Sequence, residues 1–369
     1  MLERTKLRRA AKSFVAVGLR GVGKTVLLSR IRQNAEALGF RVCAVEAHEQ
    51  KSLPDLLLPH LRRVMLDLDR LGALNEQAKR GLRVLKSFMS GVRLRHGDFE
   101  MSLDVDPESG SADSGDIEAD LPELFAALGR AAVARGVGVA FIIDELQYLT
   151  ERDMSALIMS IHRAAQDSLP IVMLAAGLPQ VVGLSGRSKS YAERLFDFPP
   201  VDALRHDDAV RALSGPANDE GVEFDHDALL EIVRITKGYP YFLQEWGYHS
   251  WNYATRSPIR RADVLAATKL ALQRLDESFF RVRFDRLTPR EKEYLRAMAE
   301  LGAGPHRSGD IADTLGAKVQ SVGPLRSGLI GKGMIFSPAH GDTAFTVPLF
   351  DEFLHRTMPA WRPPGRALP

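Results

Sequence analysis

The chain has 369 residues, of which 45% are hydrophobic and 26% are charged, as is typical of a soluble globular protein with two or three domains. Its 49 basic and 47 acidic residues nearly balance, so the formal net charge of +2 indicates no general attraction to nucleic acid or to an anionic membrane. The single cysteine, Cys43, excludes an internal disulfide, and no apolar run is long enough to span a membrane. The basic segment 1–12 lacks the apolar core of a signal sequence, and we expect a cytoplasmic protein with no membrane partner.

A glycine-rich turn follows the first expected strand, at residues 13–17, and precedes apolar residues at helical spacing over residues 26–38. The turn reads GLRGVGKT and fits the phosphate-binding pattern G-x-x-x-x-G-K-[ST] at every fixed position. Its glycines let backbone N–H groups close around phosphate oxygens, and the following helix adds the positive end of its dipole. We expect ATP with Mg²⁺, Lys24 reaching the β- and γ-phosphates and Thr25 ligating the metal. The residues predicted to bind the nucleotide are Gly18, Leu19, Arg20, Gly21, Val22, Gly23, Lys24, Thr25 and Val26.

Strand and helix patterns alternate up to about residue 200, which predicts a parallel sheet with helices on both faces, an α/β fold of the P-loop NTPase type. An acidic stretch at about 103–120 interrupts this alternation and is poor in apolar residues. We interpret it as a flexible insertion or a surface hairpin. The strands are expected at residues 14–17, 41–45, 139–143, 171–175 and 194–198.

A second motif ends the apolar run at residues 139–143, where Asp144 and Glu145 follow directly. A continuous apolar run is typical of a strand buried on both faces of a parallel sheet, whose carboxyl end carries the chemistry. We expect Asp144 to hold Mg²⁺, directly or through water, and Glu145 to polarise the attacking water. A glutamate at this position favours slow ATP hydrolysis over binding without turnover.

The patterns change after the nucleotide-binding domain, which we assign to residues 1–201. Residues 202–284 show only helical patterns and predict a small helical lid domain. Residues 285–358 show three helical patterns, then two short strands around a turn and a closing helix, which is the order of a winged-helix domain. The proline-rich residues 359–369 predict a disordered tail.

With these motifs, nearly the whole chain resembles AAA+ ATPases of the bacterial and archaeal group between origin-recognition-type initiators and STAND signalling ATPases. The segment GYPYFLQ at residues 238–244 looks like the Gly-x-Pro lid motif of STAND proteins, and the resemblance implies that Pro240 leans on the nucleotide base. It also implies that Arg194, at the start of the fifth expected strand, is an arginine finger for a neighbouring subunit of a homo-oligomer.

Three departures from the family pattern concern catalysis. Only seventeen residues precede Gly18, so we expect either that part of the base pocket is missing or that the given sequence starts late. The sensor position after the fourth strand reads Ala175-Ala176-Gly177 and offers no polar side chain for the lytic water. The lid has residues 239–241, Tyr-Pro-Tyr, where initiators have an arginine. Together these departures predict a slow switch rather than a motor.

The expected winged helix has eight basic and eight acidic residues between Leu287 and Arg356, so its charge does not favour DNA over a protein partner. If it binds double-stranded DNA, the contacts are expected from Lys318, Gln320, Ser321 and Arg326. The sequence therefore predicts an ATPase that acts as a nucleotide-controlled switch between ATP and ADP states. The alternatives are a regulator that binds nucleotide without hydrolysing it and an adaptor that binds protein.

Overall fold

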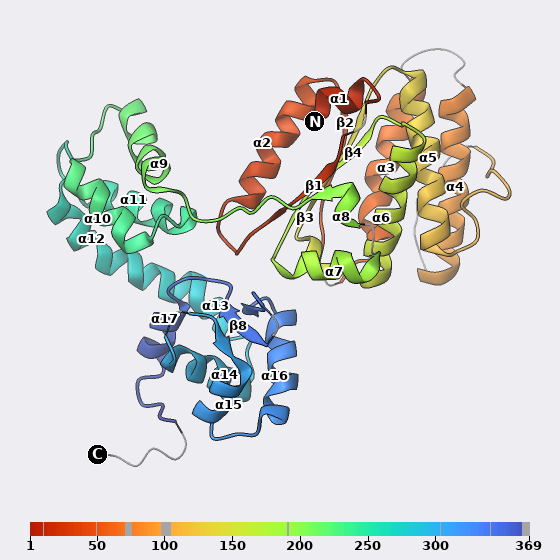
Figure 1. Cartoon of the computed structure of the whole chain (residues 1–369). Helices are drawn as coiled ribbons and strands as arrows, with labels where there is room; N and C mark the ends of the chain where they lie inside the picture. Colours follow the sequence, from red (N-terminus) through yellow and green to blue (C-terminus); the bar gives the residue numbers. More distant parts are fainter. Residues whose placement is uncertain are drawn as a thin grey trace. The chain divides into compact units, whose positions relative to one another are not determined.

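The computed structural model describes all residues except 10, 49, 71–75, 97–104, 190–191, 303, 340 and 364–369. The chain divides into two compact units, one of residues 1–18 and 24–200 and the other of residues 19–23 and 201–369. Figure 1 shows the elements of both units. Residues 19–23, the middle of the glycine-rich turn, belong to the second unit by their contacts.

The first unit is built on a five-stranded sheet in the order β2-β3-β4-β1-β5, with every pair of neighbours parallel. Helix α2 packs against β2, β3 and β4, while α3 to α6 gather on the other side of the sheet (Figure 1). Phe125 of α5 stacks on Phe141 of β3 with ring centroids 4.3 Å apart, in the core on that side. The predicted fold class is therefore confirmed. The strands are β1 Ser13–Val17, β2 Arg41–Glu46, β3 Val139–Asp144, β4 Ile171–Gly177 and β5 Phe196–Asp197.

The helices of this unit follow the strands in the expected alternation. They are α1 Leu2–Lys6, α2 Lys24–Ala37, α3 Leu53–Arg70, α4 Glu76–His96, α5 Ile117–Ala134, the 3₁₀ turn η1 Leu146–Tyr148, α6 Glu151–Gln166, α7 Gln180–Ser188 and α8 Ala192–Leu195. Cys43 is fully buried in β2, and burial raises the pKa of its thiol to about 12, as expected of a small core residue.

The fifth strand is shorter than the sequence predicts: β5 pairs with β1 at Ser13↔Phe196 and Phe14↔Asp197, and an isolated bridge, Val17↔Pro200, follows beyond its end. Pro199 and Pro200 follow it and have no N–H groups for further ladder hydrogen bonds. Arg194 therefore lies in the short helix α8 rather than at the start of a strand.

The acidic insertion predicted at about 103–120 ends earlier than expected, because α5 begins at Ile117 with Asp116 as its N-cap. The buried Asp120 carboxylate accepts hydrogen bonds from the Ser114 hydroxyl at 2.7 Å and from the backbone N–H of Gly115 at 2.8 Å. Earlier in the stretch, Glu108 pairs with Arg80 and Arg83 of α4. These carboxylates anchor the segment, whereas residues 103 and 104 lie outside the described part.

The second unit begins with the helices α9, α10 and α11 and then continues from residue 261 to residue 284 as α12, the π-helical segment η2 and α13 without a break. Its C-terminal part has a three-stranded antiparallel sheet in the order β6-β8-β7. The elements are α9 His206–Asp219, α10 His226–Thr236, α11 Pro240–Tyr253, α12 Arg261–Arg274, η2 Leu275–Phe280, α13 Arg281–Phe284, α14 Pro289–Glu300, β6 His306–Arg307, α15 Ser308–Thr314, α16 Val319–Gly331, β7 Ile335–Phe336, β8 Asp342–Phe345 and α17 Phe350–Thr357.

One aromatic core runs through this unit and across the predicted domain boundary at residues 284–285. Phe280 of η2 lies 6.3 Å from Phe242 of α11 and 5.2 Å from Phe353 of α17, measured between ring centroids. Trp361 packs against the same core, and the Arg296 guanidinium lies 5.2 Å from its ring centroid. The prediction of a disordered tail from residue 359 is therefore wrong for residues 359–363, and the rest of the tail lies outside the described residues.

A buried carboxylate in this unit predicts a pH dependence of its stability. Glu231 of α10 is 5% exposed and accepts hydrogen bonds from Arg234 at 2.5 Å and Arg261 at 3.1 Å. The hydrogen bond from Arg234 lowers the pKa of Glu231 most, and burial opposes it. Because the folded-state pKa is lowered, this contribution is present above the ordinary pKa of 4.5 and is lost as pH falls through the folded-state value.

We expect Glu231→Gln to lower the free energy of unfolding by about 1 kcal/mol at pH 7, because it leaves two arginines without their charged partner. The difference from the unchanged protein should shrink as pH falls below about 4.5. Urea unfolding followed by tryptophan fluorescence measures it, since Trp246, Trp251 and Trp361 all lie in the second unit. Glu220→Gln, at an exposed position of the same unit, is the control. An equal effect at pH 7 and pH 3.5 would contradict the assignment.

Candidate nucleotide site

The glycine-rich turn leaves the carboxyl end of β1 and enters α2 at Lys24, as the phosphate-binding pattern requires. The N–H of Gly18 donates to the carbonyl oxygen of Gly177, the last residue of β4, at 3.2 Å. Gly21 and Gly23 have φ angles of +84° and +93°, which residues with a side chain rarely adopt. Lys24 is only 6% exposed, and its Nζ donates to the Gly18 carbonyl oxygen at 3.0 Å, inside the turn.

The two predicted magnesium ligands are in direct contact. The Thr25 hydroxyl donates to Asp144 Oδ2 at 2.6 Å, which joins the first turn of α2 to the end of β3. The other oxygen, Asp144 Oδ1, accepts the backbone N–H of Glu145 at 2.8 Å. A hydroxyl and a carboxylate oxygen are the donors that Mg²⁺ takes in nucleotide sites, so these residues fit the metal. No group of three or more His, Cys, Asp or Glu side chains among the described residues forms another metal site.

Glu145 has a left-handed backbone, with φ of 52°, immediately after β3. Its carboxylate accepts a hydrogen bond from the side-chain amide of Gln147, whose carbonyl oxygen in turn accepts the N–H of Leu178 at 3.0 Å. Gln147 thus links Glu145 to the segment directly after β4. The sequence offers no polar side chain at residues 175–177, at the end of β4. It did not point to Gln147, because this residue follows the end of β3 instead.

Within the second unit, the turn residues 19–23 contact the lid motif. The Tyr239 hydroxyl donates to the Arg20 carbonyl oxygen, and the Tyr241 N–H donates to the Gly21 carbonyl oxygen at 3.1 Å. A side chain on Gly21 would meet both tyrosines at 3.1 Å. Burial raises the pKa of Tyr239, which keeps its hydroxyl protonated as a donor. Pro240, the predicted base contact, lies between these tyrosines at the first position of α11.

The start of that lid motif has a strict steric requirement. Gly238 has φ of +72°, its carbonyl oxygen accepts the N–H of Leu204 at 2.9 Å, and an added Cβ would lie 2.3 Å from the Leu204 carbonyl oxygen. Only glycine fits this position. The backbone conformation of Gly238 places Tyr239 and Tyr241 against the glycine-rich turn.

The remaining predicted residues lie elsewhere. Arg194 is exposed in α8, beside the amino end of β1, whereas the glycine-rich turn follows the carboxyl end of that strand. Lys318, Gln320 and Ser321 are exposed at the start of α16. Arg326 is partly buried and donates to the Thr343 hydroxyl at 2.9 Å and to the Asp342 carbonyl oxygen at 2.9 Å. It therefore braces the hairpin instead of presenting a free guanidinium.

Comparison with known proteins supports the assignment of the first unit. Residues 7–184 match the family model described as AAA domain, and residues 277–354 match a domain of unknown function. An uncharacterized HTH-type transcriptional regulator of Methanocaldococcus jannaschii is 24% identical over 212 residues. That match covers 55% of this chain, which spans about half (51%) of the relative's length.

Solved structures of similar fold cover most of the chain at low identity. The Walker-type ATPase of Pyrococcus abyssi is 18% identical with a TM-score of 0.48, covering 89% of this chain and 94% of that one. The RuvB Holliday junction branch migration motor of Thermotoga maritima is 14% identical with a TM-score of 0.46, covering 100% and 92%. The Aeropyrum pernix ORC1 protein in complex with DNA is 16% identical with a TM-score of 0.42, covering 97% and 90%. Likenesses of this degree carry no argument about function.

The region that matches the AAA domain model contains the glycine-rich turn, Asp144, Glu145 and Gln147. The geometry and the match agree on an α/β P-loop domain equipped for a nucleotide. In the described part of the chain, no helix is both long and apolar enough to cross a membrane.

Proposed function

We propose that this protein binds ATP with Mg²⁺ at residues 18–26, hydrolyses it slowly, and uses the nucleotide state as a conformational switch. The observation that supports this most is the direct hydrogen bond between Thr25 and Asp144, with Glu145 next to it and held by Gln147. The AAA domain match over residues 7–184 points in the same direction.

The protein's own groups have separate roles in this proposal. Lys24 leaves the Gly18 carbonyl oxygen and pairs with the β- and γ-phosphates, while Thr25 and Asp144 hold the metal. Magnesium supplies charge neutralisation at the phosphates. Glu145 takes the proton of the attacking water, and Gln147 holds the carboxylate toward the end of β4. Gln147 acts through Glu145 and is a positioning residue.

The switch rests on contacts inside the second unit. The carbonyl groups of Arg20 and Gly21 are held by Tyr239 and Tyr241, so a nucleotide that rearranges the turn disturbs these hydrogen bonds. The Tyr241 ring stacks on Phe279 at 4.5 Å, and the adjacent Phe280 packs on α17. We infer that this aromatic core carries the nucleotide state to the C-terminal part, whose order of elements supports a winged helix.

Two substitutions separate binding from hydrolysis. Lys24→Ala should lose ATP affinity, by about a hundredfold or more, because the main phosphate cation is removed. Glu145→Gln should keep ATP affinity and lose turnover, because it preserves shape but removes the base. Calorimetry with ATP and Mg²⁺ and a phosphate-release assay measure the two effects. If Glu145→Gln hydrolyses ATP at the unchanged rate, Glu145 is not the base; if Lys24→Ala binds ATP normally, the nucleotide site is wrong.

Gln147→Glu tests the positioning role, because it keeps an acceptor for the Leu178 N–H while replacing the donor to Glu145 by a like charge. We expect turnover to fall about tenfold or more at unchanged ATP affinity. Gln166→Glu, at the exposed end of α6, adds the same charge and should change neither property. Unchanged turnover in Gln147→Glu would refute the role.

Arg194 is proposed to act on a neighbouring subunit, because it lies by the amino end of β1 and its own glycine-rich turn follows the carboxyl end. Arg194→Ala should lower turnover about a hundredfold without loss of ATP affinity. Mixing it with Glu145→Gln subunits should restore part of the activity, since each variant supplies the group that the other lacks. Absence of recovery in mixtures shown to co-assemble would count against a shared site.

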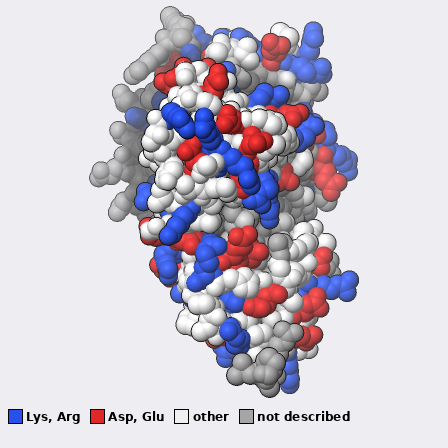
Figure 2. Space-filling model, turned by 90° about the vertical axis from the view of Figure 1, so that its left-hand side faces the viewer, with Lys and Arg blue, Asp and Glu red and all other residues white. Residues whose placement is uncertain are grey.

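A second function, binding of double-stranded DNA, is supported by the curated relative described as an HTH-type transcriptional regulator and by the exposed polar start of α16. The charge pattern limits its strength. Basic and acidic side chains lie interspersed on the face shown in Figure 2, and the region from Leu287 to Arg356 is formally neutral. Since Arg326 is engaged with the hairpin, Lys318, Gln320 and Ser321 are the remaining candidates for contact with DNA.

Lys318→Ala should weaken duplex binding and reduce the slope of log K against log salt by roughly 0.9, the value of one phosphate contact. Fluorescence anisotropy at several salt concentrations, with ATP and Mg²⁺, measures both quantities. Arg290→Ala removes the same charge from an exposed position of α14 and should leave the slope unchanged. If the unchanged protein shows no duplex binding at low salt, the output of the switch is a protein partner instead.

A further inference from the structure

A pocket of about 300 Å³ lies in the first unit at the amino ends of three strands, away from the glycine-rich turn. Ser13 and Ile171 begin β1 and β4 there, and Leu195 directly precedes β5. The turn follows the other end of β1, a strand of five residues that spans roughly 13 Å. Of the residues given a role in the functions proposed above, Arg194 alone lines this pocket.

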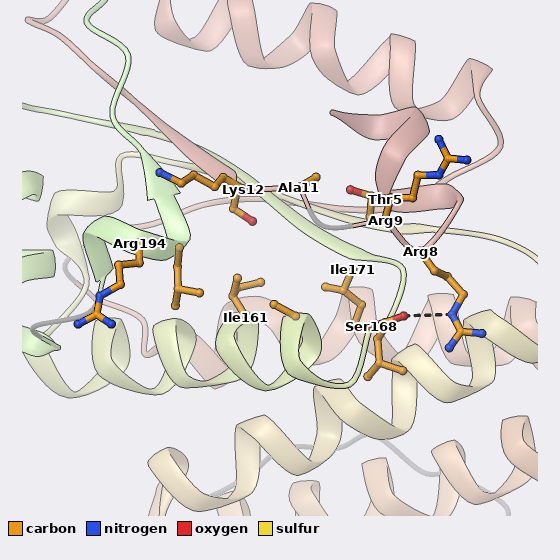
Figure 3. Close-up of a pocket in the computed structure, with 13 residues that line it drawn as sticks. Thr5, Arg8, Arg9, Ala11, Lys12, Ile161, Ser168, Ile171 and Arg194 are labelled. Carbon is orange, nitrogen blue, oxygen red and sulfur yellow. Dashed lines mark hydrogen bonds between the residues drawn. The ribbon is translucent and has the colours of Figure 1, made fainter.

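Four cationic side chains stand around the pocket: Arg8, Arg9, Lys12 and Arg194. Figure 3 shows Lys12 and Arg194 toward one end and Arg8 toward the other. None of the described residues that line the pocket is acidic. Within the described part of the chain, Lys12 alone of these four has a carboxylate partner, Asp197 at 3.1 Å, and both side chains of that pair are largely exposed. An exposed pair of this kind contributes little and competes weakly with a ligand.

The arginines differ in how firmly they are placed. Arg8 has a left-handed backbone, with φ of 56°, and its Nε donates to the Ser168 carbonyl oxygen at 3.1 Å. This bond satisfies the carbonyl after α6 and fixes the stem of Arg8 at the rim of the pocket. The side chains of Arg9 and Arg194 have no hydrogen-bond or ion-pair partner among the described residues. Their guanidinium groups are therefore available to an anion.

Apolar side chains form the floor between the two groups of cations. Ile161 and Ile171 lie there in Figure 3, and Leu169 completes the buried surface. A purely inorganic anion would leave this floor without a partner, whereas a flat or aliphatic body would cover it. The volume fits a small molecule, and a concave site of this size does not match the convex backbone of a DNA duplex.

We propose that this pocket binds a small organic phosphate, with its apolar body on the floor of Ile161, Leu169 and Ile171 and its phosphate at the cationic side chains of one end of the rim. The site is separate from the nucleotide site, and the proposal does not depend on ATP hydrolysis. Arg194 would take part in both the pocket and the nucleotide site of a neighbouring subunit. A small phosphate bound in the pocket would therefore compete with that subunit for the Arg194 side chain.

The test uses the full chain carrying Lys24→Ala, so that the glycine-rich turn does not bind the probe. Calorimetry compares phenyl phosphate, which has both a ring and a phosphate, with inorganic phosphate and with benzyl alcohol, which have one of these features each. We expect saturable binding of one phenyl phosphate per chain, at least tenfold tighter than either of the other probes. Adding Arg9→Ala and Arg194→Ala removes one cation from each end of the pocket and should weaken binding at least tenfold. Both positions are exposed, so the fold is not at risk.

The matched control adds Arg30→Ala and Arg32→Ala on the exposed side of α2, which removes the same charge elsewhere and should change the affinity less than twofold. Equal weakening by both pairs of substitutions would show a general charge effect and overturn the proposal. Phenyl phosphate binding no more tightly than inorganic phosphate would also overturn it. A third outcome would overturn it as well: phenyl phosphate does not bind, and sedimentation shows that the chain self-associates until Arg9→Ala and Arg194→Ala are introduced. The pocket would then hold part of a second copy of the chain. Failure of ATP hydrolysis in the unchanged protein would leave all these readouts unaffected.

Discussion

The hydrogen bond between Thr25 and Asp144 is the contact on which the nucleotide site depends. It joins residues 119 positions apart in the sequence, at the first turn of α2 and the end of β3. The parallel sheet makes this meeting possible, because the carboxyl ends of its strands share one edge. The other two candidate residues are next to this pair in the sequence. Lys24 directly precedes Thr25 in α2, and Glu145 directly follows Asp144 at the end of β3.

The second unit depends on a different interaction, the packing of aromatic rings. Tyr239 and Tyr241 are brought to the turn by Gly238, which no other residue can replace without a clash. The rings of Tyr241, Phe279 and Phe280 continue this packing toward α17. The π-helical segment that carries Phe279 and Phe280 is a rare form of helix, of the kind often found at functional sites. A turn that is part of this core and is proposed to bind phosphate is well suited to report the state of the nucleotide.

The two ends of β1 carry different positive sites. At its carboxyl end, backbone N–H groups and a buried lysine surround the expected phosphates. At its amino end, exposed arginines surround an apolar floor. The first kind of site is selective through fixed backbone geometry, whereas the second depends on long side chains and is more sensitive to salt. Arg194 belongs to the second end, so within this unit the length of a strand separates it from Glu145, the proposed base.

The sequence by itself determined the phosphate-binding turn, the strand ending in Asp144 and Glu145, and the alternation that defines the α/β class. Each of these is a local pattern in which residue type and spacing express the chemistry directly. Only the tertiary structure decided that Gln147 holds Glu145, that Arg326 braces a hairpin, and that Asp120 anchors the acidic segment. It also decided that Arg194 stands in a basic pocket with Arg8 and Arg9. These roles depend on partners from distant segments, and a polar side chain in a sequence does not reveal which of many possible hydrogen bonds the folded chain will give it.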